Sequence, residues 1–428
     1  MGEAATYVFI HLGAGPVPAG RLVMNDDEPR APWASFAYGT RYLERDDRVA
    51  IDPEQLPLPP RAQDNAYLTE EGFATFGAIR DAAPDGWGRY LMYKAMRDRT
   101  PTEIDVILAS GPHRVGALAF GPTPERPRRV TPWNGTDEAD EFFPLAELAR
   151  ATEEAQQVDQ LSEPLRRLLT AGSSLGGARP KGVTRREDGS EWIAKFPARA
   201  DAIPECRVEY ATMTLAARLG LDVPRIDFTR AWERDVYLIE RFDRSPQDER
   251  RTHFVSGLTM LSAHEGEAHT YGYADLATAL RRHGSAVRRD LRELYRRMLF
   301  NILVTNDDDH LRNHGFLWDG SGWRLSPLYD VVPKPQLSLE RRLALAVGPE
   351  GRAATLGNAG AGAAPFDVDR EEAVALAAGM AGEVANGWEV AFAEGGLGAA
   401  DRARFATCFR MADPAVHRLG QADLSGRP

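Results

Sequence analysis

The feature that most constrains this chain is a helical stripe of apolar residues that runs directly into an acidic loop. Within residues 289–304 the apolar positions recur at helical spacing, at Leu291, Leu294, Tyr295, Met298, Leu299 and Ile302. This pattern predicts a helix with one face in a protein core. The next segment, residues 306–310, contains three consecutive aspartates. A buried helix is therefore expected to hold a set of carboxylates in a defined place.

Two further residues extend this loop into a pattern that is typical of phosphotransfer. Asn313 follows Asp308 by five positions, and Asp330 comes after an apolar segment at 316–318. In kinases one carboxylate orients the attacking hydroxyl, an amide five residues later holds a metal ion, and a second carboxylate holds Mg²⁺ against the nucleotide phosphates. Oxygen ligands of this kind suit Mg²⁺. We therefore predict Asp308 as the catalytic residue and Asn313 and Asp330 as metal ligands.

Other interpretations of the acidic loop stay open at this point. A run of charges is most often a solvated surface. In addition, His310 and His314 are four residues apart among the aspartates, which could suit Zn²⁺ or Mn²⁺ in a hydrolase. The roles of Asp307 and Asp309, which flank Asp308, are not decided by the spacing.

The segment upstream, roughly residues 170–245, is predicted to form one sheet with a helix at 205–219. Its glycine-rich loop contains Gly176, Gly177 and Gly182, which permit close approach of the backbone to phosphates, and Lys181, which can reach them. The loop lacks the Gly-Lys-Ser/Thr of a Walker A motif. It is also compatible with a flexible turn between strands.

A lysine inside an apolar strand is the next candidate. Lys195 lies in the predicted strand 191–196, and its charge needs a partner if it is buried. Glu209 on the following helix is the candidate partner, as in the lysine–glutamate pair of kinases. A lysine whose charged end reaches the solvent is the competing interpretation. At the end of the sheet, residues 240–242 are a candidate hinge for an adenine ring.

The order of these segments along the chain favours a kinase, because several weak signals agree. Two rival functions remain. A small-molecule kinase, such as an antibiotic phosphotransferase, shares the Asp-x4-Asn spacing. A catalytically inactive binding module could instead act as a corepressor with a DNA-binding partner.

The rest of the chain is predicted as a β-rich beginning and a helical end. We expect a loop at 13–20, a strand at 36–43, helices at 86–98 and 399–411, a linker at 121–136 and a surface loop at 348–364. These elements suggest three domains: an N-terminal subdomain at 1–140, an N-lobe with the glycine loop at 141–243, and a helical C-lobe at 244–428.

Composition indicates where the protein is expected to be located and which partners it is expected to bind. The net charge of −11 argues against direct nucleic-acid binding, which needs clustered basic residues. The chain has no run of about 18 apolar residues, so no membrane span is expected. With two cysteines and no secretion signal at its start, the protein is expected to be cytoplasmic.

Taken together, these motifs resemble those of the HipA toxin kinases. The resemblance is carried by residues 174–181, 239–243, 306–314 and 328–330, and in the N-terminal part by 84–89 and 114–120. It implies an α+β, two-lobed, protein-kinase-like fold with a β-rich N-terminal subdomain and a helical C-lobe. It also implies ATP and Mg²⁺, and a toxicity that a small DNA-binding antitoxin (HipB-like) restrains.

The resemblance also implies roles for individual residues. Members of the family can phosphorylate aminoacyl-tRNA synthetases and can phosphorylate themselves on a serine in the glycine loop. Ser174 matches that serine, with Ser173 beside it. The residues that match the ATP site are Gly176, Gly177, Ala178, Arg179, Pro180, Lys181, Lys195, Glu240, Arg241, Phe242, His310, Asn313 and Asp330. The chain departs from ordinary protein kinases in having no His-Arg-Asp and no Asp-Phe-Gly motif.

Overall fold

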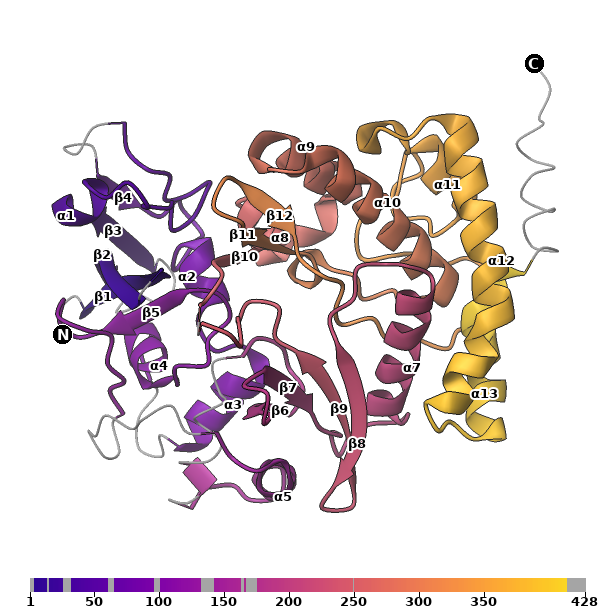
Figure 1. The fold of residues 1–428 in the computed structure, drawn as a ribbon, viewed down its shortest axis with the longest axis horizontal. Coiled ribbons are helices and arrows are strands. Elements are labelled where there is room, and N and C mark those ends of the chain that lie inside the picture. The colour runs from indigo at the N-terminus through magenta and orange to yellow at the C-terminus, as the bar shows by residue number, and fades with distance from the viewer. Residues whose placement is uncertain are drawn as a thin grey trace. The chain divides into compact units, whose positions relative to one another are not determined.

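A computed structural model describes residues 4–13, 15–25, 32–60, 65–95, 101–131, 142–162, 165–166, 175–248 and 250–413 (Figure 1). The chain folds into two compact units. The first contains Met1–Ala200 and Thr229–His264, and the second contains Asp201–Phe228 and Glu265–Pro428. Both helices and antiparallel sheets are present, so the α+β class is confirmed. The three predicted domains stay a prediction, and each unit is described by itself below.

The N-terminal part of the first unit is a five-stranded antiparallel sheet of order β4-β3-β2-β1-β5. Its strands are β1 (Ala4–Leu12), β2 (Gly15–Asn25), β3 (Trp33–Tyr38), β4 (Ala66–Leu68) and β5 (Leu118–Gly121). The loop expected at 13–20 is wrong, because most of it belongs to β2. Pro16 and Pro18 are tolerated there since this end of β2 pairs with β1, whereas β3 pairs only from Gly20 onward.

Five helices accompany this sheet in the sequence: α1 (Thr40–Leu43), α2 (Gly77–Asp81), α3 (Gly86–Ala95), α4 (Glu103–Ala109) and α5 (Leu145–Ala155). The strand expected at 36–43 ends at Tyr38, and its second half is α1. The helix expected at 86–98 is confirmed as α3 up to Ala95, and its last residues lie outside the described part of the chain.

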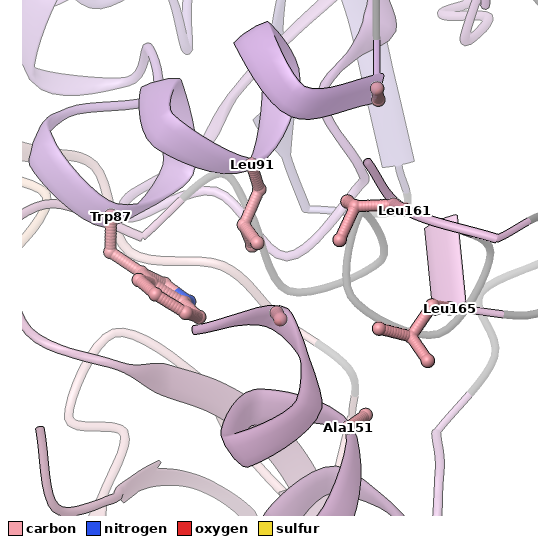
Figure 2. Packing of buried hydrophobic residues seen from close by; sticks show 7 residues of the cluster. Trp87, Leu91, Ala151, Leu161 and Leu165 are labelled. Carbon is pink, nitrogen blue, oxygen red and sulfur yellow. The ribbon is translucent and has the colours of Figure 1, made fainter. Parts of the chain in front are cut away.

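Helices α3 and α5 pack through a small apolar cluster that Figure 2 shows from close by. Trp87 and Leu91 on α3 face Ala151 on α5, and Leu161 and Leu165 close the same cluster. All five side chains are buried. The indole of Trp87 is the largest of them, so its burial contributes most to holding the two helices together.

A second antiparallel sheet of order β6-β7-β9-β8 contains β6 (Lys181–Arg185), β7 (Glu191–Lys195), β9 (Arg234–Glu240) and the edge strand β8 (Ile226–Ala231). Alternate residues of β7 and the residue that follows it, at 192, 194 and 196, point into an apolar core formed with α5 and β9. The predicted sheet at 170–245 is therefore present. A short strand, β10 (Phe254–Ser256), and helix α8 (Gly257–Met260) follow it.

A buried ionic network joins two segments of the first unit that are far apart in sequence. The Asp243 carboxylate accepts hydrogen bonds from Arg241, from Arg244 and from the backbone N–H of Gly116. Arg241 also donates to the carbonyls of His113 and Arg114. Burial acts against the charge of Asp243, but the two guanidiniums outweigh it and hold the pKa of Asp243 well below its ordinary value.

The second unit is mainly helical. It contains α7 (Glu205–Arg218), α9 (Tyr273–His283), α10 (Val287–Val304), α11 (Leu356–Ala361), α12 (Arg370–Glu394) and α13 (Ala399–Phe405), together with the hairpin of β11 (Gly315–Trp318) and β12 (Trp323–Leu325). Short 3-10 turns occur at Glu265–Thr270, Leu311–Asn313, Ala364–Phe366 and Ala406–Ala412. Helix α12 packs against both α7 and α10 (Figure 1).

Helix α10 confirms the strongest sequence prediction, because all six apolar positions of its stripe are fully buried. It is followed by Thr305, whose φ of 56° is left-handed and turns the chain sharply into the acidic loop. Two predictions near the C-terminus are only partly right. Residues 348–364 include helix α11, and the helix expected at 399–411 changes to a 3-10 turn at Ala406. Within the described residues, no helix is both long and apolar enough to cross a membrane.

The cluster around Trp87 yields a stability prediction. We expect Trp87→Ala to lower the free energy of unfolding of the first unit by roughly 3–5 kcal/mol, because it leaves a cavity between α3 and α5. Tyr93→Ala is the matched control, since that ring lies on the same helix but is 51% exposed, and it should change stability by about 0.5 kcal/mol or less. Urea unfolding followed by tryptophan fluorescence and circular dichroism measures both. Equal effects of the two substitutions would contradict this account of the cluster.

Candidate functional site

The glycine loop in the first unit is supported by the start of helix α3. The backbone N–H of Trp87 donates to the carbonyl of Gly177, with 3.0 Å between N and O. Gly177 has a φ of +95°, which a residue with a Cβ rarely adopts. A Cβ placed on Gly86 would lie 2.5 Å from the Cα of Ala178, so glycine is required at position 86 as well. The Pro-Asp-Gly-Trp segment at 84–87 therefore packs against the glycine loop and supports its backbone.

Lys181 and Lys195 are directly opposite each other on β6 and β7. Side chains in such a pair project on the same face of a sheet, and like charges there oppose each other. Lys195 also lies over the ring of Tyr237, at 5.8 Å, and the ammonium of Lys181 donates to the carbonyl of Gly176. Two cations at the base of a glycine loop make this face suited to an anion such as a phosphate.

The remaining residues predicted for the nucleotide side are placed less directly. Glu240 and Phe242 lie where β9 ends, while the side chain of Arg241 is committed to the buried network with Asp243. At position 241, only the backbone is therefore available for the predicted adenine contact. Glu209 is buried in α7 of the second unit, so its ion pair with Lys195 stays a prediction. Ser173 and Ser174 lie outside the described residues.

The three consecutive aspartates in the second unit have three different environments. Asp309 is buried, and its carboxylate accepts hydrogen bonds from the Tyr273 hydroxyl and from the backbone N–H of Ala344, the latter at 2.9 Å. Burial raises the pKa of Asp309 to about 7, although these hydrogen bonds act in the opposite direction. Asn301 in turn donates to the Tyr273 hydroxyl, and Asn306 donates to Asn301. Asp309 therefore anchors the loop in the core.

Asp308, by contrast, points outward, with 62% of its side chain exposed. The ammonium of Lys334 lies 3.3 Å from a carboxylate oxygen of Asp308 and 3.3 Å from one of Asp307. Gln336 donates to the other oxygen of Asp307 at 2.6 Å. The predicted catalytic carboxylate is thus the most exposed of the three. Lys334 and Gln336 were missed by the sequence analysis, because no spacing relates them to the acidic loop.

Asn313 and Asp330 are brought near each other by local hydrogen bonds. The side-chain NH₂ of Asn313 donates to the backbone carbonyl of Asp308 at 2.8 Å, which leaves its amide oxygen for another partner. The hydroxyl of Tyr329 donates to the carbonyl of Arg312, so the residues next to Asn313 and Asp330 are in direct contact. Asp330 has a φ of +63°, a strained conformation for aspartate that is common at functional sites.

The two predicted metal ligands offer an amide oxygen and a carboxylate oxygen, a type of donor that suits Mg²⁺. Mg²⁺ is commonly bound by one or two protein oxygens together with substrate phosphates and water. Across the described residues, no group of three histidines, cysteines or acidic residues is placed to hold a metal ion. His314 is buried against the ring of Tyr273, at 5.3 Å between centroids, and burial lowers its pKa to about 3. The backbone N–H of His310 donates to the Asp308 carbonyl, which stabilises the turn.

The burial of Asp309 yields a prediction on pH dependence. Because its folded pKa of about 7 is above the ordinary value for aspartate, the folded state keeps a proton that the unfolded chain releases, and stability should fall between about pH 4 and pH 7. Asp309→Asn removes this pH dependence, which amounts to at most about 1.4 kcal/mol in the free energy of unfolding for each pH unit. Relative to wild type, the variant should therefore become more stable as the pH rises through this window.

Denaturant unfolding at pH values from 4.5 to 8 measures this difference. Asp319→Asn is a suitable control, because hydrogen bonds from Ser285 and Ser321 outweigh desolvation and lower the pKa of Asp319 to about 2. Its stability should therefore run parallel to that of wild type over this range. A parallel curve for Asp309→Asn would show that Asp309 does not carry a raised pKa.

Comparison with known proteins identifies the family. The profile of the HipA-like C-terminal domain matches residues 173–388. The chain is 25% identical over 364 residues to a protein named "Putative kinase Y4mE" from Sinorhizobium fredii, covering 76% of this chain and 80% of that protein. It is 28% identical over 164 residues to the serine/threonine-protein kinase toxin HipA of Shewanella oneidensis, covering 33% of this chain and 37% of the toxin.

A solved structure agrees with these sequence matches. The fold is similar to a chain in a complex of Shewanella oneidensis HipA with HipB and operator DNA, with a TM-score of 0.64, 18% identity and 95% of each chain covered. At this identity the likeness establishes the fold alone, and it confirms the predicted kinase-like architecture. The glycine loop, the acidic loop and Asp330 all lie within the residues that the family profile matches. Because this profile matches half of the chain, the chain belongs to the family of proteins with a HipA-like C-terminal domain.

Proposed function

We propose that this protein is an ATP- and Mg²⁺-dependent serine/threonine protein kinase that acts as a growth-inhibiting toxin. The observation that carries the proposal is the arrangement of the acidic loop. Its middle carboxylate, Asp308, is exposed, and the next one, Asp309, is buried as an anchor. Asn313 is bound to the Asp308 backbone at the spacing used in kinases.

In the proposed reaction the hydroxyl oxygen of a serine or threonine attacks the γ-phosphorus of ATP. A new bond forms between this oxygen and phosphorus, and the bond from phosphorus to the β,γ-bridging oxygen breaks. ADP leaves with the electron pair of that bond, and the hydroxyl proton passes to the Asp308 carboxylate. Orienting the hydroxyl is the main task of such a carboxylate, since phosphoryl transfer is promoted chiefly by positioning and electrostatics.

The other predicted residues have complementary roles. Asn313 and Asp330 would hold Mg²⁺, which supplies charge neutralisation to the phosphates when bound. Lys181 and Lys195, opposite each other at the base of the glycine loop, would bind phosphate oxygens. The packing of Gly86 and the backbone hydrogen bond of Trp87 keep the backbone of that loop in place.

The proposed partners follow from the relatives. HipA of Shewanella oneidensis has been solved with HipB and operator DNA, and we propose that a small DNA-binding antitoxin likewise restrains this chain. With a net charge of −11, this chain would leave most DNA contacts to a basic partner. We further propose that the kinase acts in the cytoplasm on a translation component such as an aminoacyl-tRNA synthetase.

The first functional prediction concerns Asp308. Wild-type protein incubated with γ-³²P-ATP and Mg²⁺ should transfer label to itself or to proteins of a cell extract, and Asp308→Asn should lower this rate roughly 10²–10⁴-fold. Expression of the wild type, but not of Asp308→Asn, should arrest growth.

Asp275→Asn is the matched control, because that carboxylate accepts a hydrogen bond from the backbone N–H of Gly272 at the start of α9. It should label at the wild-type rate. An inactive wild type would favour the binding-module alternative. Labelling of aminoglycosides or other small molecules, without labelling of proteins, would favour the phosphotransferase alternative.

The second functional prediction concerns Ser174 in the glycine loop. Ser174→Ala should remove most self-labelling while initial activity toward other proteins is kept, whereas Ser173→Ala should label itself as the wild type does. Phosphate at this position adds negative charge where the nucleotide phosphates bind, so activity of the wild type should decline during incubation with ATP. Phosphopeptide mapping by mass spectrometry checks the site, and a modified residue elsewhere would overturn the assignment.

A further inference from the structure

The distribution of lysine in this chain is uneven. Of its 52 lysine and arginine residues only four are lysines: Lys94, Lys181, Lys195 and Lys334. The ammonium of Lys94 donates to the backbone carbonyls of Ala155 and Val158 and joins α3 to the end of α5. Lys181 and Lys195 are the two predicted phosphate-binding residues. The fourth, Lys334, has no role in the function described so far.

The backbone of Lys334 is fixed beside the acidic loop. Its backbone N–H donates to the carbonyl of Thr305, the residue that follows α10, at 3.0 Å. Pro333 and Pro335 flank it, and each proline restricts the backbone on its own side. The position of the lysine stem relative to the acidic loop is therefore defined by the backbone.

The ammonium of Lys334 lies beside the carboxylates of the acidic loop. Its ammonium lies 3.3 Å from both Asp307 and Asp308, and 47% of its side chain is exposed. Partial burial disfavours the ammonium, but the Asp308 and Asp307 carboxylates outweigh it and raise the pKa of Lys334. An ammonium has three N–H donors, so two can serve the carboxylates and one remains for a further acceptor.

We propose that Lys334 is a catalytic residue that stabilises the phosphoryl group during transfer, an inference that rests on the proposed kinase function. In a near-attack geometry, the attacked phosphorus lies roughly 3 Å from the hydroxyl that hydrogen-bonds to Asp308. A cation 3.3 Å from the same carboxylate can then reach an equatorial phosphoryl oxygen. Charge on these oxygens is what kinases stabilise in the transition state.

The charges change in a way that favours this contact as the reaction proceeds. When the hydroxyl proton arrives at Asp308, the carboxylate loses its negative charge and attracts the ammonium less. The phosphoryl oxygens then become the stronger partners of Lys334. Lys334 keeps its own proton throughout, so no additional donor or acceptor is required.

Lysine suits this role better than arginine does. A static bridge between two carboxylates would be served at least as well by a guanidinium, which is planar and binds carboxylates through two N–H groups. An ammonium is a compact point charge that can change partners over a short distance. This chain has arginine at nearly every basic position. The lysine at 334 is therefore better explained by an ammonium that changes partners during the reaction than by a fixed ion pair.

Lys334→Met tests the proposal by removing the charge. We expect kcat for protein phosphorylation to fall roughly 10²–10³-fold, as when one transition-state hydrogen-bond donor is removed, with KM for ATP within about twofold of wild type. Arg342→Met, which removes an exposed cation from the same segment, is the control and should leave kcat unchanged. The kcat of Lys334→Arg should lie between those of Lys334→Met and Arg342→Met, since arginine keeps the positive charge but replaces the compact ammonium with a planar guanidinium.

A binding measurement supplies a readout that does not depend on turnover. Calorimetry with MgADP should give the same affinity for wild type and Lys334→Met. With aluminium fluoride added, which mimics the transferring phosphoryl group, the affinity of wild type should rise at least tenfold more than that of the variant. A residue that only positions Asp308 would lower kcat without this difference in binding.

Chemical rescue separates loss of the charge from damage to the fold. Cys206 and Cys408 are both buried, and burial raises the pKa of Cys408 to about 12, so a cysteine introduced at position 334 should react selectively. Lys334→Cys should have the activity of Lys334→Met, and treatment with 2-bromoethylamine, which builds a lysine-like ammonium there, should restore at least a tenth of wild-type kcat.

The outcomes distinguish the two proposals. A wild type that transfers no phosphate overturns both the kinase function and the role of Lys334. An active wild type together with a Lys334→Met variant of full kcat, or a modified Lys334→Cys that regains nothing, overturns the role of Lys334 alone.

Discussion

The candidate site depends on a carboxylate that is not itself available for catalysis. Asp309 enters the core and is held by the Tyr273 hydroxyl and the backbone of Ala344. Because neighbouring residues in a tight loop point in different directions, fixing Asp309 inward leaves Asp308 outward. The cost of burying a carboxylate is reduced by these hydrogen bonds and by the raised pKa of Asp309. The shape of the loop is thus set by burial, and the predicted catalytic carboxylate, Asp308, is exposed one residue away.

A comparable division exists in the first unit, where two segments of the N-terminal part contact the glycine loop and the predicted hinge. Asp243, just beyond the predicted hinge, binds the backbone of Gly116, and Gly86 is packed against the glycine loop at Ala178. The N-terminal segments at 84–89 and 114–120 therefore have structural tasks in this protein. They contact the predicted hinge at Asp243 and the glycine loop at Ala178.

Several elements were predictable because their signals are local. The apolar stripe of α10 repeats at helical spacing and every one of its positions is buried. The pattern predicts a loop in place of the first part of β2 because Pro16 and Pro18 normally interrupt strands, and only the register of the sheet shows that they lie where β2 pairs with β1 alone. Helix α4 was missed although Thr102 and Asp105 form a capping box, a signal that the sequence does contain.

By itself the sequence determined the α+β class and the kinase-like order of motifs, and it supplied the candidate residues for phosphotransfer, since these depend on spacing along the chain. Tertiary structure decided which of three adjacent aspartates is exposed, and it brought Lys334 to Asp308. Spacing could not decide either point. Burial of Asp309 comes from Tyr273 and Ala344, each more than 30 residues away, and the position of Lys334 comes from a turn that packs back on the end of α10.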